Sequence, residues 1–600
     1  MTMRTHTCGD LSKTDIGNAV TLCGWVDTVR DHGGVIFIDV RDRYGLTQVI
    51  YDPTDSKEAW EVAQRTRGEY VIQIEGVVEA RPDDMVNPKL STGAIEVRST
   101  SIVILNEAAT PPFPLEDKQA EKVSEELRLQ YRYLDLRRSS MQKKLRLRHK
   151  IAQAVRAYLD GLDFVEVETP ILTKSTPEGA RDYLVPSRVT PGTFFALPQA
   201  PQQYKQLLMV AGIDRYFQIA HCFRDEDLRA DRQPEFSQID IEMSFITPED
   251  LYGVVDSMMV EVLKASGFDA PALPFPRMDY HHAMNTYGSD KPDVRFDFEI
   301  QDLGEVFEGT EFKVFAGVLG GGGCVKALNA KGLAGVPIRV MDGWTDVAKE
   351  QGLGGLAYIR VQEDGSWKSP IVKFFSEAEK EGLQKELDMQ VGDLILFGAG
   401  GWNQVCESLG RLRLLAGEMA EVIPQDGFAF TWVTDFPLFE TTTDGKLTPM
   451  HHPFTSPKRE DIPLLEEDPA RARAQAYDLV LNGVEIGGGS IRIHDSETQA
   501  KMFAILGMPE EEVEDRFGHL LKGLSFGAPP HGGIAFGFDR LAMLMTGSDT
   551  IRDVIAFPKS QKAMDLMMAA PAKVDPHQLR DVYLELALPK EDEASKRGET

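Results

Sequence analysis

Residues 222–245 read C-F-R-D-E-D-L-R-A-D-R-Q-P-E-F-S-Q-I-D-I-E-M-S-F and carry the pattern that decides the fold. Because successive side chains of a strand point to opposite faces, this pattern predicts two strands joined by a charged loop. One face is polar and carries Arg224, Glu226, Phe236, Gln238, Asp240 and Glu242. A solvated hairpin also alternates, but an arginine, three carboxylates, an amide and an aromatic ring could together hold an anion, a cation and a flat ring.

The composition is that of a large globular protein. The chain has 600 residues, 42% of them hydrophobic, and a formal net charge of -29. This length predicts three or four domains. No targeting segment is recognisable, and no apolar run approaches the ~18 residues of a membrane span, so we expect a cytoplasmic protein. The five cysteines are widely spaced, which argues against disulfides and structural zinc. The acidic charge argues against a general nucleic-acid coat protein, although a local basic stripe could bind RNA.

Residues 1–107 are predicted to form a small β-barrel. Five apolar runs with a helical stretch after the third match the OB fold; the runs are 20–29, 35–40, 46–51, 70–79 and 94–105, and the helix is 56–67. Phe37, Arg30 and Gln48 could stack on unstacked bases and read their edges. Taken alone, these three residues fit a core phenylalanine beside two surface polar residues better.

The rest of the chain divides into further segments by composition. Residues 108–141 are rich in Pro and Glu and are predicted to be a hinge. A glycine-rich α/β insertion at 291–425 interrupts one domain, whose parts are 142–290 and 426–558. Residues 559–600 form a C-terminal extension, and its end, from Lys590, is predicted to be disordered.

Two stretches could contact phosphate. Nine basic residues lie between Arg128 and Lys150 against one acid, Asp135, which indicates a phosphate-backbone contact or a solvated helix face. Residues 532–541 (G-G-I-A-F-G-F-D-R-L) predict a glycine-rich strand that runs into a helix. The glycines permit close approach of a ligand, and Arg540 at the helix start could meet a phosphate.

Three blocks, in this order, resemble the signature motifs of the class II aminoacyl-tRNA synthetases. F-V-E-V-E-T-P at 164–170 resembles motif 1 with its dimer-interface proline, F-R-D-E followed by R-Q-P-E-F at 223–236 resembles motif 2, and G-F-D-R-L at 537–541 resembles motif 3. Further blocks, S-T-P-E-G-A-R-D, M-H-H-P-F-T and G-G-G-S-I-R-I-H, are similar to the bacterial-type aspartyl-tRNA synthetases. Ala200 departs from that pattern, because relatives usually carry serine there.

The resemblance implies an α+β multidomain fold. An N-terminal OB-fold barrel (1–107) would bind the anticodon, and a class II antiparallel-sheet catalytic domain would carry the inserted α/β domain. It also implies a homodimer that activates L-aspartate with ATP as aspartyl-adenylate and transfers it to the 3′ end of tRNA(Asp). The anticodon contacts would be Arg30, His32, Phe37 and Gln48. His32 indicates that tRNA(Asn) is charged too, but Asp84, near a second position linked to that property, matches neither pattern, so this point stays open.

Neither step of that reaction strictly needs a protein nucleophile, so positioning and charge stabilisation would do the work. The resemblance implies that Arg224 contacts the α-phosphate and the substrate carboxylate, and that Arg540 holds the γ-phosphate; these two are the predicted catalytic residues. Glu226 would accept from the adenine amino group and Phe236 would stack on the ring. The other predicted ATP-binding residues are Asp225, Gln233, Glu485, Gly537, Phe538 and Asp539.

Two further sets of residues follow from the resemblance. Asp478 and Glu485 resemble Mg²⁺-binding acids, since hard cations prefer oxygen ligands, although Asp478 could instead be an ordinary helix-face acid. The predicted aspartate site has cations for the side-chain carboxylate, acids for the ammonium group and a histidine that closes over it. Its members are Arg492, Lys205, Glu178, Asp240, Gln202, Arg224 and His451.

Two alternatives compete with this hypothesis. The same fold could charge asparagine or lysine, although Arg492 and Lys205 would repel the ammonium of lysine. A non-catalytic RNA-binding paralogue is the second alternative. It would have no need of Arg224, Glu226, Glu485 and Arg540 together.

Overall fold

The computed structural model describes residues 3–176, 180–442 and 444–587. The chain divides into two compact units: residues up to Arg146 together with Arg552–Ala572, and Leu147–Ile551 with the residues after Ala572. This division is coarser than the six predicted segments, whose boundaries stay predictions. Within the described ranges, no helix is long and apolar enough to cross a membrane.

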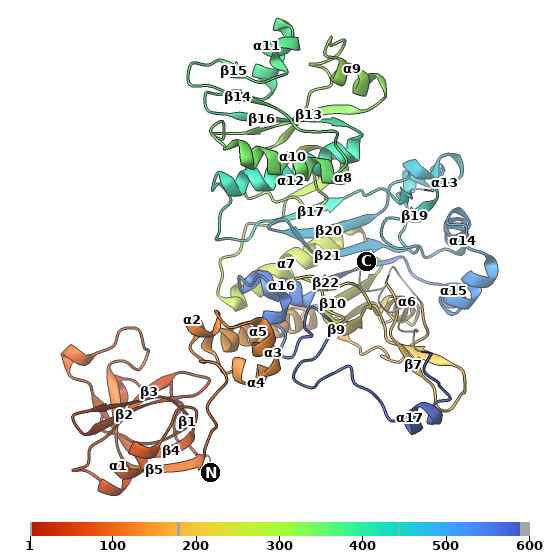
Figure 1. The fold of residues 1–600 in the computed structure, drawn as a ribbon. Coiled ribbons are helices and arrows are strands. Elements are labelled where there is room, and N and C mark those ends of the chain that lie inside the picture. Colours follow the sequence, from red (N-terminus) through yellow and green to blue (C-terminus); the bar gives the residue numbers. More distant parts are fainter. Residues whose placement is uncertain (1–2, 177–179, 443, 588–600) are drawn as a thin grey trace. The chain divides into compact units, whose positions relative to one another are not determined.

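The first unit contains the predicted OB-fold barrel. Its strands close in the order β1-β2-β3-β5-β4, and a helix follows β3; the elements are β1 Ala19–His32, β2 Val35–Arg41, β3 Leu46–Tyr51, α1 Lys57–Arg65, β4 Val71–Ala80 and β5 Ile95–Asn106 (Figure 1). Gly33 and Gly34 form the two-residue turn between β1 and β2, and both have positive φ, which this hairpin turn requires. Val20, Leu22 and Val26 alternate into the core along β1.

Short helices follow the barrel, in and beyond the predicted hinge: α2 Asp117–Ala120, α3 Glu125–Gln130, α4 Arg132–Asp135 and the start of α5 Ser139–Asp160. The basic stretch lies here and in α5. Six of its nine basic residues form ion pairs with carboxylates; these are Arg128, Arg132, Arg137, Arg138, Lys144 and Arg148. Asp135, fully buried, accepts from Arg132 at 2.7 Å and from Arg138 at 2.9 Å. Asp135 is a local partner of Arg128, Arg132 and Arg138, whereas Arg137, Lys144 and Arg148 pair with carboxylates distant in sequence, so these six side chains are engaged within the protein.

The second unit is built on an eight-stranded sheet with the order β11-β17-β20-β21-β22-β10-β9-β6. The inner strands are antiparallel, and only the two edge pairs are parallel. This confirms the predicted antiparallel class II sheet. Its strands are β6 Val165–Glu166, β9 Arg215–Phe223, β10 Glu235–Ser244, β11 Arg277–Asp279, β17 Phe430–Thr434, β20 Ala476–Leu481, β21 Val484–Ile491 and β22 His531–Gly537.

Helices and two small hairpins surround this sheet (Figure 1). Helix α16 follows β22 directly and packs beside β10, while α6 contacts β9 and β10. The helices are α6 Gln202–Val210, α7 Pro248–Ser266, α8 Tyr280–Tyr287, α13 Leu464–Glu467, α14 Ser496–Ile505, α15 Glu510–Leu524, α16 Phe538–Met545 and α17 Pro576–Asp581. The hairpins pair β7 Leu184–Pro186 with β8 Phe194–Ala196 and β18 Phe439–Thr441 with β19 Leu447–Pro449.

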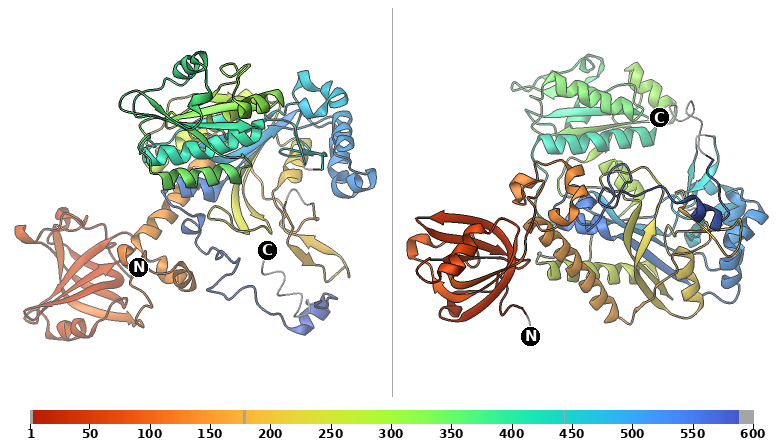
Figure 2. Two further views of the ribbon diagram at one scale, coloured as in Figure 1. Left: turned by 45° about the horizontal axis from the view of Figure 1, so that its top comes forward. Right: turned by 60° about the horizontal axis from the view of Figure 1, so that its bottom comes forward.

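The predicted insertion is a second sheet, with the order β12-β13-β16-β14-β15. Helices cover both of its faces (Figure 2), so its inner strands are apolar on both sides. Along β16, Leu394 and Leu396 belong to one hydrophobic cluster, and Ile395 and Phe397 to the other. The elements are β12 Ile300–Asp302, α9 Lys313–Gly320, β13 Cys324–Ala330, α10 Ile338–Glu350, β14 Ala357–Val361, β15 Trp367–Lys368, α11 Glu377–Glu386, β16 Leu394–Gly400 and α12 Trp402–Met419.

Two glycines let α12 of the insertion meet the end of α8. A Cβ at Gly410 would lie 2.3 Å from the Gly288 carbonyl oxygen, and Gly288 has φ +68°. We therefore expect Gly410→Ala to cost about 2 kcal/mol, because the contacting atoms are backbone and cannot rotate away. Differential scanning calorimetry measures this as a lower melting temperature.

The matched control is Gly253→Ala in α7, where a Cβ would meet no atom within 4 Å. That change should be neutral or stabilise the protein by up to about 1 kcal/mol, through higher helix propensity. Equal melting temperatures for the two variants would contradict the close contact.

Candidate functional site

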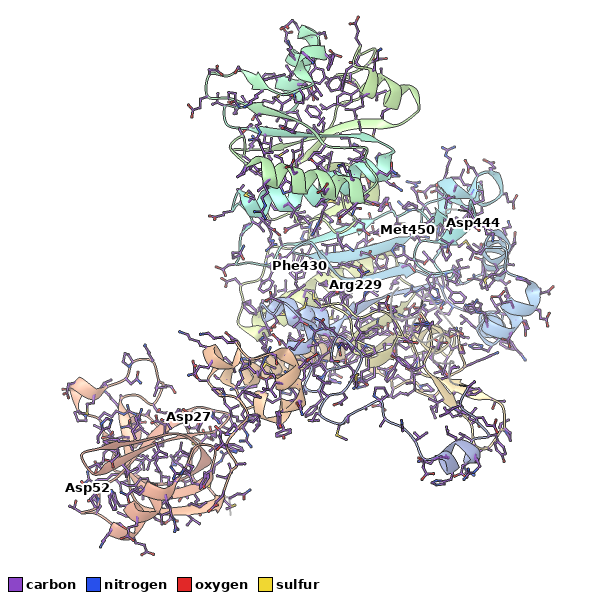
Figure 3. The ribbon with its side chains drawn as sticks, in the orientation of Figure 1. Asp27, Asp52, Arg229, Phe430, Asp444 and Met450 are labelled. Carbon is purple, nitrogen blue, oxygen red and sulfur yellow. The ribbon has the colours of Figure 1, made fainter. Side chains whose placement is uncertain are left out.

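A polar cleft of about 1080 Å³ opens over the middle of the eight-stranded sheet. Strands β10, β20, β21 and β22, the loop after β9 and the starts of α6 and α16 contribute its walls; Arg229 and Met450, both lining residues, are labelled in Figure 3. Most of the predicted site residues in the described ranges line it. Glu178 lies outside the described residues, so its role stays a prediction.

At one end of the cleft, Arg224 and Phe236 lie together. The guanidinium carbon of Arg224 is 5.2 Å from the centre of the Phe236 ring, and Arg224 Nε is buried without a hydrogen-bond partner among the described residues. Glu226 accepts from Arg232 at 2.9 Å. A planar ring, a guanidinium with a free donor and a carboxylate can together bind a flat base and an anion.

The loop between β9 and β10 contributes the other predicted residues at this end. Gln233 is buried and lines the cleft. Asp225 also lines it from a more exposed position, where its Oδ2 lies 3.4 Å from Arg181 Nε. Arg540 donates to the Glu485 carbonyl oxygen at 2.8 Å and to Asp231 at 3.0 Å. Asp231 was not predicted. It holds the guanidinium of Arg540 in the wall of the cleft.

The predicted residues that precede Arg540 differ in what they face. Gly537 lines the cleft, whereas Phe538 is buried and packs under the Arg148 guanidinium at 4.2 Å without lining it. Asp539 lines the cleft, but it is also paired with Arg148 and accepts from the backbone N–H of Ser237 at 2.7 Å. Asp539 therefore ties α16 to β10.

The centre of the site is a buried network of two cations and two carboxylates. Arg492 donates to both oxygens of Glu242, at 3.0 and 3.2 Å, and to Ser490 at 2.7 Å. Lys205 Nζ lies 2.6 Å from Asp240 and 3.2 Å from Glu242. Lys205 and Arg492 line the cleft, while Asp240 does not line it and is fully buried, with Oδ2 unpartnered among the described residues. No role was predicted for Glu242, although its place on the polar face of the second strand was.

This network fixes the ionisation of Glu242. Burial alone would raise the pKa of its carboxyl group, but the charges of Arg492 and Lys205 and the hydrogen bonds from Arg492 lower that pKa to about 2. Gly533 opposite makes room for it, since a Cβ there would lie 2.1 Å from Glu242 Oε2. At this position the glycine accommodates a carboxylate of the protein rather than the predicted ligand.

Carboxylates gather at a third place in the cleft. Asp478 and Glu485 both line it, and a Cβ at Gly488 would lie 2.6 Å from Asp478 Oδ1 and 3.6 Å from Glu485 Oε1. The charge of Asp478 and then burial raise the pKa of Glu485. Asp478 lies on β20, so the helix-face alternative is wrong. Within the described ranges, no group of three or more His, Cys, Asp and Glu residues is placed to hold a metal.

His451 extends this acidic group. Its Nε2 lies 3.6 Å from Asp478 Oδ1. Burial opposes protonation of the imidazole, but Asp478 and the charge of Glu485 raise its pKa above the ordinary value. Because Asp478 Oδ1 is buried without a hydrogen-bond partner among the described residues, the pair of carboxylates fits a hard cation.

The barrel brings its four predicted residues together. Arg30 donates to Gln48 at 3.1 Å and to Asp39 at 2.9 Å, and the His32 ring meets Phe37 edge-on at 5.7 Å. Phe37 is half-buried on β2, directly opposite Arg30 on β1. The alternative of a lone core phenylalanine therefore fits this surface less well.

The ion network predicts how substitution of Glu242 affects stability. Glu242→Gln keeps the shape but removes one buried charge, so we expect a loss of about 3–5 kcal/mol near neutral pH, because the cations are left undercompensated. Since the folded-state pKa is lowered, this contribution is present above the ordinary carboxyl pKa of 4.5 and is lost as pH falls toward about 2. Urea unfolding at several pH values measures it.

Glu235→Gln is the matched control, an exposed carboxylate on the same strand. It should cost less than about 1 kcal/mol. If both variants unfold at the same urea concentration, the network does not stabilise the fold.

The chain matches known proteins over almost its whole length. The family described as tRNA synthetases class II (D, K and N) matches residues 124–561, and an OB-fold nucleic acid binding domain matches residues 20–105. An aspartate–tRNA(Asp/Asn) ligase of Desulfatibacillum aliphaticivorans is 54% identical, over 99% of this chain and 98% of the relative. One of Syntrophotalea carbinolica is also 54% identical, over 98% of both chains.

Solved structures with low sequence identity share the fold. The asparaginyl-tRNA synthetase from Pyrococcus horikoshii with asparaginyl-adenylate has a TM-score of 0.58 and 18% identity, covering 95% of this chain and 99% of that one. The aspartyl-tRNA synthetase from Entamoeba histolytica has a TM-score of 0.56 and 20% identity, covering 92% and 90%. Together with the relatives above, the antiparallel sheet, its cleft and the OB-fold barrel show that the chain belongs to the class II aminoacyl-tRNA synthetases, in the family of bacterial aspartate–tRNA(Asp/Asn) ligases.

Proposed function

We propose that this chain activates L-aspartate with ATP and transfers the aspartyl group to the 3′ end of tRNA(Asp). The observation that carries the proposal is the cation pair Lys205 and Arg492 in the wall of the cleft. Glu242 and Ser490 already use three of the five N–H groups of Arg492, and Asp240 and Glu242 use two of the three N–H groups of Lys205. The remaining N–H groups are all donors, so they suit a carboxylate, which only accepts.

These remaining N–H donors distinguish aspartate from asparagine and lysine as substrates. Protein carboxylates already balance the two cations, so net charge alone would not select the substrate. The amide of asparagine has an NH₂ group that would meet N–H donors, and the ammonium of lysine would meet only donors and like charge. A site that leaves polar groups unpaired rejects the wrong ligand strongly.

In the first step of the proposed reaction, a carboxylate oxygen of aspartate attacks the α-phosphorus and pyrophosphate leaves. Arg224, whose Nε is buried and has no partner among the residues that the structure describes, would stabilise the negative charge that develops at phosphorus. Phe236 would stack on the adenine, and Glu226 would accept from its amino group. In the second step, a ribose hydroxyl of the tRNA attacks the carbonyl carbon of the adenylate and AMP leaves.

Asp478 and Glu485 would hold Mg²⁺, which when bound would neutralise charge on the polyphosphate of ATP. The raised pKa of Glu485 supports this assignment, because a bound cation would relieve the repulsion from Asp478 that raises it. Arg540 would hold the γ-phosphate once Asp231 gives up its contact.

We further propose a cytoplasmic homodimer. Strand β6 ends the eight-stranded sheet, and exposed apolar side chains lie on it and just after it: Val165, Ile171 and Leu172. This stretch includes the proline of the motif 1 resemblance. An apolar sheet edge of this kind is a natural surface for a second copy of the chain.

On the barrel, Arg30, Phe37 and Gln48 would contact the anticodon. His32, which packs edge-on against Phe37, would sit beside the base that distinguishes tRNA(Asp) from tRNA(Asn). The two relatives above are named for both tRNAs, and this supports charging of tRNA(Asn) as well.

Aspartate-dependent exchange between ATP and pyrophosphate tests the activation step without tRNA. Purified protein with Mg²⁺ should show exchange with L-aspartate, and at least about a hundred-fold less with L-asparagine or L-lysine. Arg224→Ala should abolish it while the melting temperature stays near that of the native protein. Exchange that is absent with L-aspartate, or equal with L-asparagine, would overturn the proposal.

Phe37→Ala tests the anticodon face. Loss of a stacking platform costs about 1–3 kcal/mol per base, so the KM for tRNA should rise about five-fold or more while ATP–pyrophosphate exchange is unchanged. Tyr44→Ala is the matched control, an exposed aromatic residue in the turn between β2 and β3. A Phe37 variant that charges tRNA like the Tyr44 variant would show that the anticodon binds elsewhere.

A further inference from the structure

Three buried polar side chains form a chain beneath the cleft. Gln202 Nε2 donates to Gln206 Oε1 at 3.1 Å, and Gln206 Nε2 lies 3.3 Å from His531 Nε2. His531 Nδ1 lies 2.8 Å from the carbonyl oxygen of Pro529. Gln206 and His531 are fully buried, and neither was predicted from the sequence as a site residue. Only Gln202 lines the cleft.

One backbone carbonyl sets the direction of this whole chain of hydrogen bonds. The Pro529 oxygen can only accept, so His531 Nδ1 carries the proton, and in a neutral imidazole Nε2 is then an acceptor. Gln206 must turn its NH₂ group to His531 and its oxygen to Gln202. Gln202 must in turn donate its NH₂ group to Gln206. The accepting carbonyl of Pro529 therefore fixes the orientation of both amides.

The result is that Gln202 Oε1 is left over at the end that lines the cleft. Among the residues that the structure describes, it has no hydrogen-bond donor. Asp240 Oδ2, the other acceptor in this part of the site, is buried and likewise has no partner in the described ranges. Among the described residues, Gln202 Oε1 is therefore an unpaired acceptor in the wall of the cleft, and Asp240 Oδ2 is a second unpaired acceptor that is fully buried.

We propose that His531 and Gln206 are positioning residues that keep the oxygen of Gln202 turned toward the α-ammonium group of the amino-acid substrate. This rests on the proposed function, because it assumes that an amino acid binds beside Gln202 and Asp240. Reversal of the Gln206 amide would turn the NH₂ group of Gln202 toward the ammonium. Two donors would then face each other, and the affinity for the substrate would fall.

The surroundings keep His531 in the neutral form that this direction needs. Burial lowers the pKa of the imidazole, and the charges of Arg492 and His494 lower it further. The charge of Glu242 and the hydrogen bond to Pro529 act in the opposite direction without overcoming burial. At neutral pH the hydrogen bonds that link Gln202, Gln206 and His531 (the relay) therefore have a single donor-to-acceptor direction.

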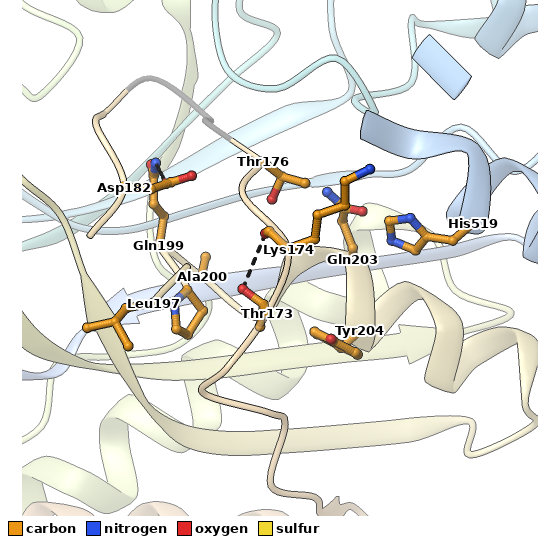
Figure 4. A pocket seen from close by; sticks show the side chains of 11 residues that line it. Thr173, Lys174, Thr176, Asp182, Leu197, Gln199, Ala200, Gln203, Tyr204 and His519 are labelled. Carbon is orange, nitrogen blue, oxygen red and sulfur yellow. Dashed lines mark hydrogen bonds between the residues drawn. The ribbon is translucent and has the colours of Figure 1, made fainter. Parts of the chain in front are cut away.

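Gln203, the next residue of α6, provides a matched control. It is as buried as Gln202, but it faces a separate cavity of about 50 Å³ together with Lys174 and His519 (Figure 4). Neither polar atom of its amide has a hydrogen-bond partner in the described part of the chain. An isosteric change to methionine there removes no hydrogen bond and should leave substrate binding unchanged.

The experiment compares Gln206→Met and Gln203→Met with two ligands, L-aspartate and succinate, by isothermal titration calorimetry of the full-length protein. Succinate keeps both carboxylates and lacks the ammonium group. Gln206→Met removes the group that orients the Gln202 amide, so binding of L-aspartate must itself fix that orientation, and its Kd should rise about five-fold. The Kd values for succinate and for ATP should stay within about two-fold of the native values. Gln203→Met should change none of the three.

Each other outcome overturns the proposal. If Gln206→Met weakens L-aspartate and succinate equally, the residue has only a structural role. If L-aspartate binds normally, or Gln203→Met has the same effect as Gln206→Met, Gln202 is not oriented by this chain. Failure of the native protein to bind L-aspartate at all would instead refute the proposed function.

Neutron diffraction from the native protein tests the relay without any variant. Deuterium on Nδ1 of His531, none on its Nε2, and the ND₂ group of Gln202 facing Gln206 are the expected result. Deuterium on Nε2 of His531, or an ND₂ group of Gln202 that faces the cleft, would refute the proposed direction whether or not the enzyme charges tRNA.

Discussion

The burial of Glu242 between Arg492 and Lys205 is the interaction on which the rest of the site depends. A fully buried carboxylate is costly unless cations and hydrogen bonds replace its water, and here two cations from distant parts of the chain do so. Glu242 comes from β10, Arg492 from the segment after β21, and Lys205 from α6. The network therefore joins two parts of the sheet and a helix at the floor of the cleft, and Gly533 is required opposite it.

This network divides the cleft into regions with different hydrogen-bonding character. Lys205 and Arg492 line it with N–H donors, Gln202 lines it with an acceptor oxygen, and Asp478 with Glu485 forms a carboxylate pair suited to a cation. The cleft then selects a ligand by the arrangement of the ligand's own hydrogen-bond donors and acceptors. Net charge would be a poorer guide, because the protein already neutralises its buried cations.

The fold could be predicted from the sequence to a large extent, because strand alternation and glycine turns are local. The barrel and the polar face of β10 follow from such patterns, and the three motif-like blocks place the antiparallel sheet. The pairing of Arg492 with Glu242 could not be predicted, since 250 positions separate them. The same holds for the basic stretch, whose partners such as Glu69 and Asp553 lie far away in sequence, and for Asp539, which bonds the backbone of β10.

Gln206 and His531 show why such residues escape sequence reasoning. A buried glutamine on an amphipathic helix and a histidine at the start of a strand belong to no recognisable motif. The role of each depends on the residue to which it is hydrogen-bonded. The direction of their hydrogen bonds is set by the carbonyl group of Pro529. Because every residue has a backbone carbonyl, the sequence does not show which one will act in this way. An acceptor fixed by the backbone at one end of the relay thus determines which atom faces the substrate at the other.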